Sequence, residues 1–556
     1  MATISVLRPK TERIERTLAW PGDFLAFGAI GVASALLVAY FLLQGQRLVG
    51  TIAMPLDDAW IHYRIAGNLA AGQGFSFNPG VPTSASTSPL WTALLAAAYA
   101  ATGQFIMPSI VLGVSFFVAA NVAVYYLALA LKPDRRLAVV AALLAAVAGR
   151  WVWSSLSGME TTLFTALALW GILLLVAGDR SGRSAPAVAG SALLCLSTLA
   201  RPEGFLLLGL AIGESLIGVA LDSRDQTLRG RIGRLLRSRF TILLLALLIA
   251  IGLRLLYTFS TSGGVLGNTF AAQSLPQGNS GYTGPRWLPD LWYWRSAVQS
   301  LRTDAFVLGL LIPFGMLHVA RLGLVSRAAH TPAILCLSWF VALPLFNAFV
   351  APNLRHHERY LMPLIPLTML FGAFRIDFLV RQLQVGRWRL GLPRLDGATA
   401  AAGLFAVVTL MCLGDALLDT RRWAIQYAGD VRNIEQINVA MGEMVRDMTP
   451  PDAYVAMNDI GAIAVVSDRR ILDTVGIAEP GILPILARQG RQGVFQYLQE
   501  KRPDYLVVWP EWYPELVART DVFTPVGSVK VDDPVTATRA PMLGGREMVL
   551  YRATWP

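Results

Sequence analysis

Eleven apolar segments constrain what this chain of 556 residues can fold into. Each is long enough, or nearly so, to cross a hydrocarbon layer of roughly 30 Å as a helix. Only 15% of the residues are charged, whereas soluble proteins average about 25%. The sequence therefore predicts an all-α, multi-span membrane domain over residues 1–418. The approximate limits of the segments are 24–45, 104–131, 137–153, 160–177, 186–200, 203–221, 240–258, 303–320, 331–350, 359–380 and 398–418.

Arginine and lysine gather in alternate connections between these segments. By the positive-inside rule such connections face the cytoplasm, here the ranges 8–16, 132–136, 180–183, 224–239, 321–327 and 375–394. Topology therefore accounts for the net charge of +11, and no nucleic-acid partner is expected. The chain is predicted to lie in the inner (plasma) membrane with its N-terminus in the cytoplasm. An odd number of spans then places the C-terminus and the remaining polar loops outside.

The composition changes after about residue 419. The pattern over 431–448 predicts an amphipathic helix, 453–457 and 504–509 predict short strands, and a helix is expected near 491–501. These elements predict an extracytoplasmic α/β domain over residues 419–556. The short apolar run at 88–100 is expected to be an amphipathic helix in the first outer loop, lying at the membrane interface.

The first outer loop begins with two adjacent carboxylates, Asp57 and Asp58. Carboxylates held just outside a lipid-embedded helix are good general-base candidates. Neighbouring helical residues point about 100° apart, so both acids cannot face one substrate equally. Asp58 is placed to cap the helix that begins there, with His62 one turn later, whereas Asp57 is placed to face a cavity. The alternative is that both acids merely cap and solvate a loop.

Two further polar clusters lie at span ends on the same side of the membrane. Ser157-Gly158-Met159-Glu160 fits the capping-box pattern, so Glu160 either bonds back to the Ser157 amide or lines a cavity. Arg201 and Glu203 place a charge pair between two apolar runs, which is costly unless the pair is buried in protein or lines water. Arg201 could hold a phosphate or simply pair with Glu203.

A third cluster, Arg355 to Tyr360, precedes the tenth segment. Its arginines and histidines could hold a lipid phosphate by charge-assisted bonds, or could simply snorkel to the interface. Adjacent histidines without ligand spacing are a weak metal signal, so no metal is expected, although the paired acids could hold a divalent cation. Asn268, in the long outer loop, by itself predicts only a turn into a short helix.

Taken in order, these pieces resemble the GT-C glycosyltransferases, and among them the actinobacterial terminal arabinofuranosyltransferase group. The likeness extends over most of the chain. It rests on Asp57 to Arg64, Gly72 to Gly80, Ser88 to Trp91, Ser157 to Thr161, Arg201 to Gly204, Asn268 to Phe270, Arg359-Tyr360 and Asn458 to Gly461. The chain departs from the group at Gly267, where proline is usual, and at Gln273, where the group carries a lysine that could grip the donor phosphate.

The resemblance implies an inverting glycosyltransferase that moves arabinofuranose, or another pentose or hexose, from a polyprenyl phosphate to an extracytoplasmic glycan or lipid acceptor. It implies no obligatory cofactor. Asp57 is expected to be the general base, with Asp58 in support. Donor or substrate binding is expected of His62, Arg64, Glu160, Arg201, Glu203, Asn268, Arg355, His356, His357, Arg359 and Tyr360. A transporter or flippase remains the alternative, favoured by the ionisable residues Glu214, Arg254 and Asp415 within or near spans.

Overall fold

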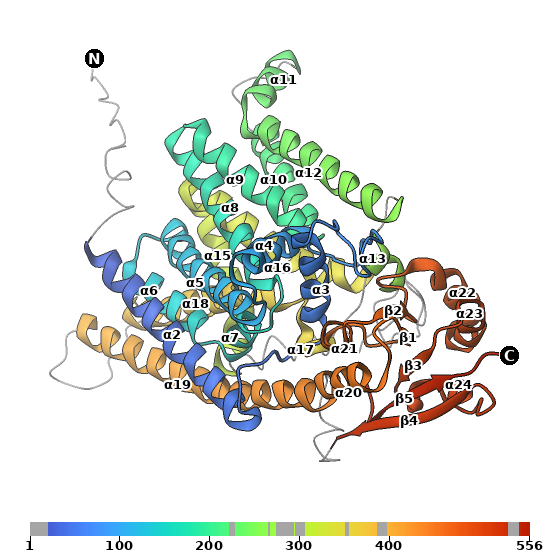
Figure 1. The fold of residues 1–556 in the computed structure, drawn as a ribbon. Helices are drawn as coiled ribbons and strands as arrows, with labels where there is room; N and C mark the ends of the chain where they lie inside the picture. The colour runs from blue at the N-terminus through green and yellow to red at the C-terminus, as the bar shows by residue number, and fades with distance from the viewer. Residues whose placement is uncertain are drawn as a thin grey trace, which may run out of the picture.

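Apolar helices form most of the computed structural model, which describes residues 21–221, 228–264, 267–273, 294, 298, 306–350, 355–385, 397–531 and 544–556. Figure 1 shows them as a bundle with a small sheet domain at one end. The helices of the bundle are α2 (Pro21–Val49), α5 (Ile106–Leu131), α6 (Arg135–Ala146), α7 (Gly149–Ser155), α8 (Thr161–Ser181), α9 (Ser184–Ala200), α10 (Gly204–Leu221), α12 (Arg239–Ser262), α15 (Phe306–Val325), α16 (Arg327–Val350), α18 (Ile365–Val385) and α19 (Gly397–Asn433).

Each of the eleven expected segments overlaps one of these helices, with α6 and α7 sharing the third segment. Within the described ranges, six helices are long and apolar enough to cross a membrane, or seven if the bent pair α6 and α7 forms one span. The chain is thus a multi-pass membrane protein, while eleven crossings stay a prediction. Further short helices are α11 (Leu228–Arg237) and α13 (Asn268–Gln273).

The loop after α2, called the first outer loop for the side of the membrane on which it is expected, folds back onto the bundle as two helices, α3 (Asp58–Ala70) and α4 (Pro89–Thr102). They pack against each other, and α4 also contacts α5 and α9. Trp91 on α4 is fully buried and donates its indole N–H to the carbonyl oxygen of Gly158 at 2.9 Å. Gly158 adopts a φ of +74°, and a Cβ there would lie 2.6–2.8 Å from atoms of Met54, Ala59 and Tyr63. Glycine therefore lets the loop before α8 approach α3 closely.

The C-terminal domain is a five-stranded mixed sheet in the order β2-β1-β3-β5-β4. Its strands are β1 (Tyr454–Met457), β2 (Arg470–Asp473), β3 (Tyr505–Val508), β4 (Phe523–Lys530) and β5 (Glu547–Ala553). β1 pairs in parallel with β2 and β3, and β5 pairs antiparallel with β3 and β4. Helices α21 (Ala462–Ser467), α22 (Leu483–Gln489), α23 (Val494–Lys501) and α24 (Pro514–Val517) connect the strands.

Helix α19 leaves the bundle and continues, without a break at the expected boundary of 418/419, through a π-helical turn (Ile434–Val439) into α20 (Ala440–Met448) (Figure 1). One apolar cluster then joins the outer loop to the sheet domain. Ile61 and Ile65 on α3 pack in it with Ile437, Val455 and Trp509. Burial of this shared apolar surface fixes the C-terminal domain against the first outer loop.

Candidate active site

Asp58, the first residue of α3, is the centre of a cluster of charged side chains. Its side chain is 31% exposed, and its Oδ2 lies 2.7 Å from Nη2 of Arg359 and 3.8 Å from Nδ1 of His356. Burial alone would raise the pKa of Asp58, but the positive charges of Arg359 and His356 outweigh it and lower the pKa. Asp58 is therefore an ionised carboxylate that remains partly open to solvent.

Behind this pair, a chain of buried contacts runs from Arg359 to Arg201. Nη2 of Arg359 lies 3.3 Å from the Tyr360 hydroxyl, and the Tyr360 ring also faces the guanidinium of Arg201, 4.8 Å from the ring centroid. Arg201 is only 3% exposed and donates to both carboxylate oxygens of Glu203, at 2.6 and 3.3 Å. A second carboxylate, that of Glu160, lies 3.6 Å from its Nη1. Arg201 thus pairs with Glu203, as one of the two alternatives expected. The other alternative, that Arg201 holds a phosphate, stays a prediction, because this pair lies inside the cluster.

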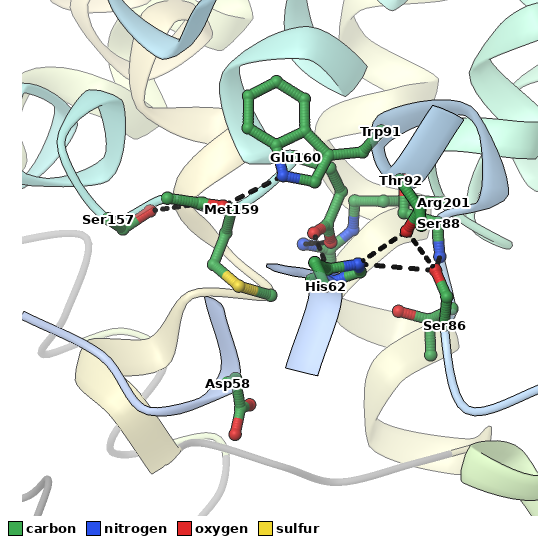
Figure 2. A network of polar contacts seen from close by, with 12 residues as sticks. Asp58, His62, Ser86, Ser88, Trp91, Thr92, Ser157, Met159, Glu160 and Arg201 are labelled. Atoms are coloured by element: carbon green, nitrogen blue, oxygen red, sulfur yellow. Dashed lines mark hydrogen bonds and ion pairs between the residues drawn. The ribbon is translucent and has the colours of Figure 1, made fainter. Parts of the chain in front are cut away.

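His62 extends the same network from α3 (Figure 2). Its Nδ1 lies 2.9 Å from the Thr92 hydroxyl and 3.4 Å from that of Ser86, while its Nε2 faces Glu160 at 3.8 Å. Burial lowers the pKa of His62, so the imidazole is neutral near pH 7. Oε2 of Glu160 is buried and has no hydrogen-bond partner among the described residues.

The capping box expected at Ser157 to Glu160 does not form. The Ser157 hydroxyl donates to the carbonyl oxygen of Ser154 at 2.8 Å and accepts the Met159 N–H at 3.3 Å. Glu160 occupies the position before α8 without a capping bond, and its side chain turns to His62 and Arg201 (Figure 2). The sequence left this choice open, and the structure places Glu160 in the cluster.

Asp57 is not placed as the sequence suggested. Its Oδ2 accepts the backbone N–H of Gly461 at 3.0 Å, and its Oδ1 accepts that of Ala462 at 2.8 Å and the side-chain amide of Asn438 at 3.2 Å. The expectation that Asp57 faces a cavity while Asp58 caps α3 is therefore wrong, because the C-terminal domain engages Asp57 and Arg359 engages Asp58. Desolvation of its carboxyl group is the larger cause and the charge of Asp459 the next, and together they raise the pKa of Asp57 to about 8.

The remaining residues expected to bind donor or substrate lie around the cluster in different roles. Arg64 bonds to Asp468 and to the carbonyl oxygens of Phe77 and Arg469, so it joins the outer loop to the C-terminal domain. Asn268 bonds to the hydroxyl groups of Ser84 and Thr83 rather than to the charged residues. The side chain of Arg355 lies outside the described part of the structure.

The segment before Arg359 has an unusual backbone. His356, His357 and Glu358 have φ values of +53°, +59° and +50°, which form a left-handed turn. This conformation costs roughly 1–2 kcal/mol per residue. The turn is held because Nε2 of His357 bonds Oδ2 of Asp430 on α19 at 2.8 Å, and Arg150 bonds the His357 carbonyl oxygen at 3.3 Å. His357 therefore positions the turn that presents His356 and Arg359 to Asp58.

Sequence reasoning gave no role to Asp459, which lies in the loop after β1. Its Oδ2 accepts the indole N–H of Trp509 at 2.7 Å, and its charge is close enough to that of Asp58 to raise its own pKa. Burial is the larger cause, and the pKa of Asp459 rises to about 6. The sequence signal that could have identified Asp459 was the motif Asn458 to Gly461, which contributed only to the family resemblance.

Two of the residues that favour a transporter, Glu214 and Arg254, have partners within the protein. Glu214 pairs with Arg239 and accepts the Thr331 hydroxyl at 3.0 Å. Arg254 donates to the carbonyl oxygen of Thr87 at 3.2 Å, so it holds the outer loop in place. Among the described residues, no group of three or more His, Cys, Asp or Glu stands close enough to hold a metal ion. The expectation of a metal-free site stays a prediction.

Residues 429–551 match a family model described as a domain of unknown function (DUF8728). No curated protein matches the chain in sequence.

Two solved membrane proteins share its fold. The archaeal oligosaccharyltransferase AglB from Archaeoglobus fulgidus, in complex with an inhibitory peptide and a dolichol-phosphate, matches with a TM-score of 0.59 and 13% identity, over 93% of this chain and 74% of that one. ArnT from Cupriavidus metallidurans, bound to undecaprenyl phosphate, matches with a TM-score of 0.52 and 13% identity, over 96% and 98%. The chain therefore has the fold of the GT-C glycosyltransferases, as its motifs predicted.

Proposed function

We propose that the chain is an inverting glycosyltransferase that moves a sugar from a polyprenyl phosphate to an extracytoplasmic glycan or lipid acceptor. The observation that carries the proposal is the pairing of a partly exposed carboxylate, Asp58, with the buried cation Arg359. Glycosyl transfer from a lipid phosphate needs both a base for the acceptor and a cation for the leaving group. AglB and ArnT, which share the fold, were solved with dolichol-phosphate and undecaprenyl phosphate bound.

Asp58 is the better candidate for the base. Both acids are partly exposed, but both oxygens of Asp57 accept backbone N–H groups of the C-terminal domain, whereas Asp58 bonds to the side chain of Arg359. In the proposed step Asp58 takes the proton of the acceptor hydroxyl as its oxygen attacks the anomeric carbon. The bond between that carbon and the phosphate oxygen breaks, and polyprenyl phosphate leaves as an anion. Attack opposite the leaving group inverts the configuration.

Arg359 supplies a cation for the donor phosphate. Its Nη1 is buried without a hydrogen-bond partner among the described residues, so one N–H donor of the guanidinium is unused. A phosphate bound there competes with Asp58 for the same positive charge. Donor binding would thereby loosen the ion pair and make Asp58 more basic. Arg201 and His356 add positive charge nearby and compensate for glutamine at position 273.

The finer assignments rest on the sequence. We propose that the sugar is arabinofuranose or a related pentose or hexose, because the ordered motifs resemble the terminal arabinofuranosyltransferase group. We also propose that the N-terminus is cytoplasmic and that the C-terminal domain and the cluster around Asp58 lie outside. A phosphatase fusion at the C-terminus should be active, and an inactive phosphatase with a fluorescent cytoplasmic fusion would contradict this sidedness.

A transfer assay tests the function. Membranes containing the wild type are incubated with labelled polyprenyl-phosphate arabinofuranose, mannose and aminoarabinose, and labelled glycan or lipid products are measured. Asp58→Asn should lower turnover by about 10²–10⁴, the usual cost of losing a general base. Its donor affinity should equal or exceed that of the wild type, because the phosphate no longer competes with a carboxylate for Arg359, and its melting temperature checks that the variant is folded.

Asp57→Asn is the matched control, because it replaces one carboxylate oxygen of the neighbouring acid by the same amide NH2 group. It should retain measurable turnover and lose thermal stability. If Asp57→Asn is inactive but stable while Asp58→Asn is active, the general base is Asp57. Activity in both variants would argue against the glycosyltransferase, and movement of labelled lipid across vesicles without transfer would favour a flippase.

A further inference from the structure

One edge of the C-terminal sheet gathers polar residues beside the proposed base. β1 and β3 run in parallel, so the residues that follow them, Asp459 and Trp509, meet at the same edge. The carboxyl edge of parallel strands is the usual place for ligands in open α/β sheets. Here this edge is turned toward the membrane domain, since the N–H groups of Gly461 and Ala462 bond Asp57 in the outer loop.

The contact at this edge is tight. A Cβ on Gly461 would lie 2.2–2.4 Å from the backbone oxygen and carboxylate of Asp57, so the loop from Asn458 to Gly461 is pressed against the start of α3. Asp459 is nevertheless partly exposed. It stands close enough to Asp58 for the two charges to repel, which is one cause of its raised pKa. A residue of the C-terminal domain therefore reaches the neighbourhood of the proposed base.

Two side-chain amides at this contact have unused oxygens. Asn438 donates its Nδ2 to Asp57, and Asn458 donates its Nδ2 to Asp459 at 3.3 Å. Their side-chain oxygens are buried without a hydrogen-bond partner among the described residues, and the two asparagines are only 2% and 6% exposed. Turning the amide of Asn458 around would place its oxygen against the carboxylate of Asp459.

The available groups at this edge are thus all hydrogen-bond acceptors. The two amide oxygens lack donors, and an unsatisfied buried acceptor costs about 1–3 kcal/mol. The partly exposed carboxylate of Asp459 accepts one bond at each oxygen, from Asn458 and Trp509, and a carboxylate has lone pairs for further donors. Polyhydroxyl compounds supply O–H donors at short spacing, whereas a phosphate supplies none. The cations that suit a phosphate, Arg359 and Arg201, belong instead to the membrane domain, where they pair with Asp58 and Glu160.

We infer that the loop from Asn458 to Gly461 forms a subsite for the hydroxyl groups of a sugar acceptor, with Asp459 as its main ligand. The inference rests on the proposed function, because it assigns the acceptor half of the same site. The C-terminal domain, matched only to a domain of unknown function, thereby completes the active site. Asp459 binds and orients the acceptor, and Asp58 receives its proton.

Asp459→Asn tests this inference, because asparagine keeps an oxygen that can accept the Trp509 N–H. The acceptor and the donor are varied separately in the transfer assay. The variant should raise KM for the acceptor about tenfold or more, as expected for the loss of a hydrogen bond to a charged group, and leave KM for the donor unchanged. Asn458→Ala, which removes one of the unused oxygens, should act in the same direction. Asp521→Asn is the control, since this exposed carboxylate of the same domain pairs only with Arg519 among the contacts described.

A binding measurement separates this inference from the proposed function. Arabino- and manno-oligosaccharides are titrated calorimetrically into purified wild type, Asp459→Asn and Asn458→Ala, each checked for folding by its melting temperature. Transfer with an unchanged acceptor KM in both folded variants overturns the inference alone. If the wild type does not transfer sugar, the proposed function is overturned. If the wild type binds an oligosaccharide and both variants do not, the subsite is supported. Absence of both transfer and binding overturns the two together.

Discussion

Asp57→Ala should release the start of α21 from the outer loop. The side chain of Asp57 accepts the backbone N–H groups of Gly461 and Ala462, and both bonds are lost in the alanine variant. Because the pKa of Asp57 is about 8, the neutral acid predominates at pH 7, and each bond contributes about 1 kcal/mol, as for neutral partners. Loss of both gives about 2 kcal/mol, which is roughly thirtyfold in a local opening equilibrium.

Hydrogen–deuterium exchange followed by mass spectrometry measures this opening directly. The peptide spanning residues 458–467 should exchange ten- to thirtyfold faster in Asp57→Ala, the lower limit allowing for water that replaces the lost carboxyl group. Asp57→Asn keeps one acceptor oxygen and should give a smaller increase. Asp58→Asn should leave this peptide unchanged. Unchanged exchange at 458–467 in Asp57→Ala would refute the view that Asp57 holds the C-terminal domain.

Three further outcomes follow from the geometry. Arg359→Lys should raise KM for the donor about tenfold with little change for the acceptor, because the planar fork is lost while the charge stays, and an unchanged donor KM would exclude Arg359 from the phosphate site. Gly158→Ala should cost about 1–3 kcal/mol more in thermal unfolding than the control Gly182→Ala, since both have positive φ but only Gly158 has neighbours that a Cβ would strike. Folding raises the pKa values of Asp57 and Asp459 to about 8 and 6, so both acids take up protons on folding, and stability should fall as pH rises from 5 to 8. Melting curves should show a shallower fall in the Asp57→Asn/Asp459→Asn double variant, and equal slopes would contradict these shifts.

The sequence predicted the membrane domain well because lipid solvation imposes one pattern on every span. An apolar segment must satisfy its backbone internally and becomes a helix, and loop charges set its side of the membrane. That reasoning placed Asp58, Glu160, Arg201 and Arg359 on one face, and the structure brings them into one cluster. Of the five strands in the described C-terminal domain, β1 and β3 were predicted. The sequence analysis missed β2, which has only four residues, and also β4 and β5.

The roles within the Asp57–Asp58 pair could not be predicted from local sequence. Helical geometry says only that adjacent side chains point in different directions. The partners of the two side chains are distant in the sequence: Asp57 bonds Gly461 and Ala462, more than 400 positions away, and Asp58 pairs with Arg359. The left-handed turn at His356 to Glu358 was equally hidden, because positive φ is uncommon for any residue other than glycine and the local sequence does not predict three such residues in a row. Long-range contacts override local preference at both places.

One continuous helix, formed by α19, the π-helical turn and α20, contacts both the turn that carries Arg359 and the outer-loop residue Asp57 beside the loop that carries Asp459. Asp430, near the end of α19, bonds His357 and so holds the turn that carries Arg359. Two turns further along, in the π-helical segment, Asn438 bonds Asp57 beside the loop that carries Asp459. A π-helical turn inserts an extra residue and rotates the side chains that follow it, a device often found at functional sites. The same helix positions both Arg359, proposed to bind the donor, and the C-terminal domain, proposed to bind the acceptor. A rotation of this helix about its axis would therefore move Arg359 and Asp459 together relative to Asp58. The continuous helix from α19 to α20 therefore fixes the positions of Arg359 and Asp459 relative to each other. The domain boundary expected at residue 418 falls within this helix.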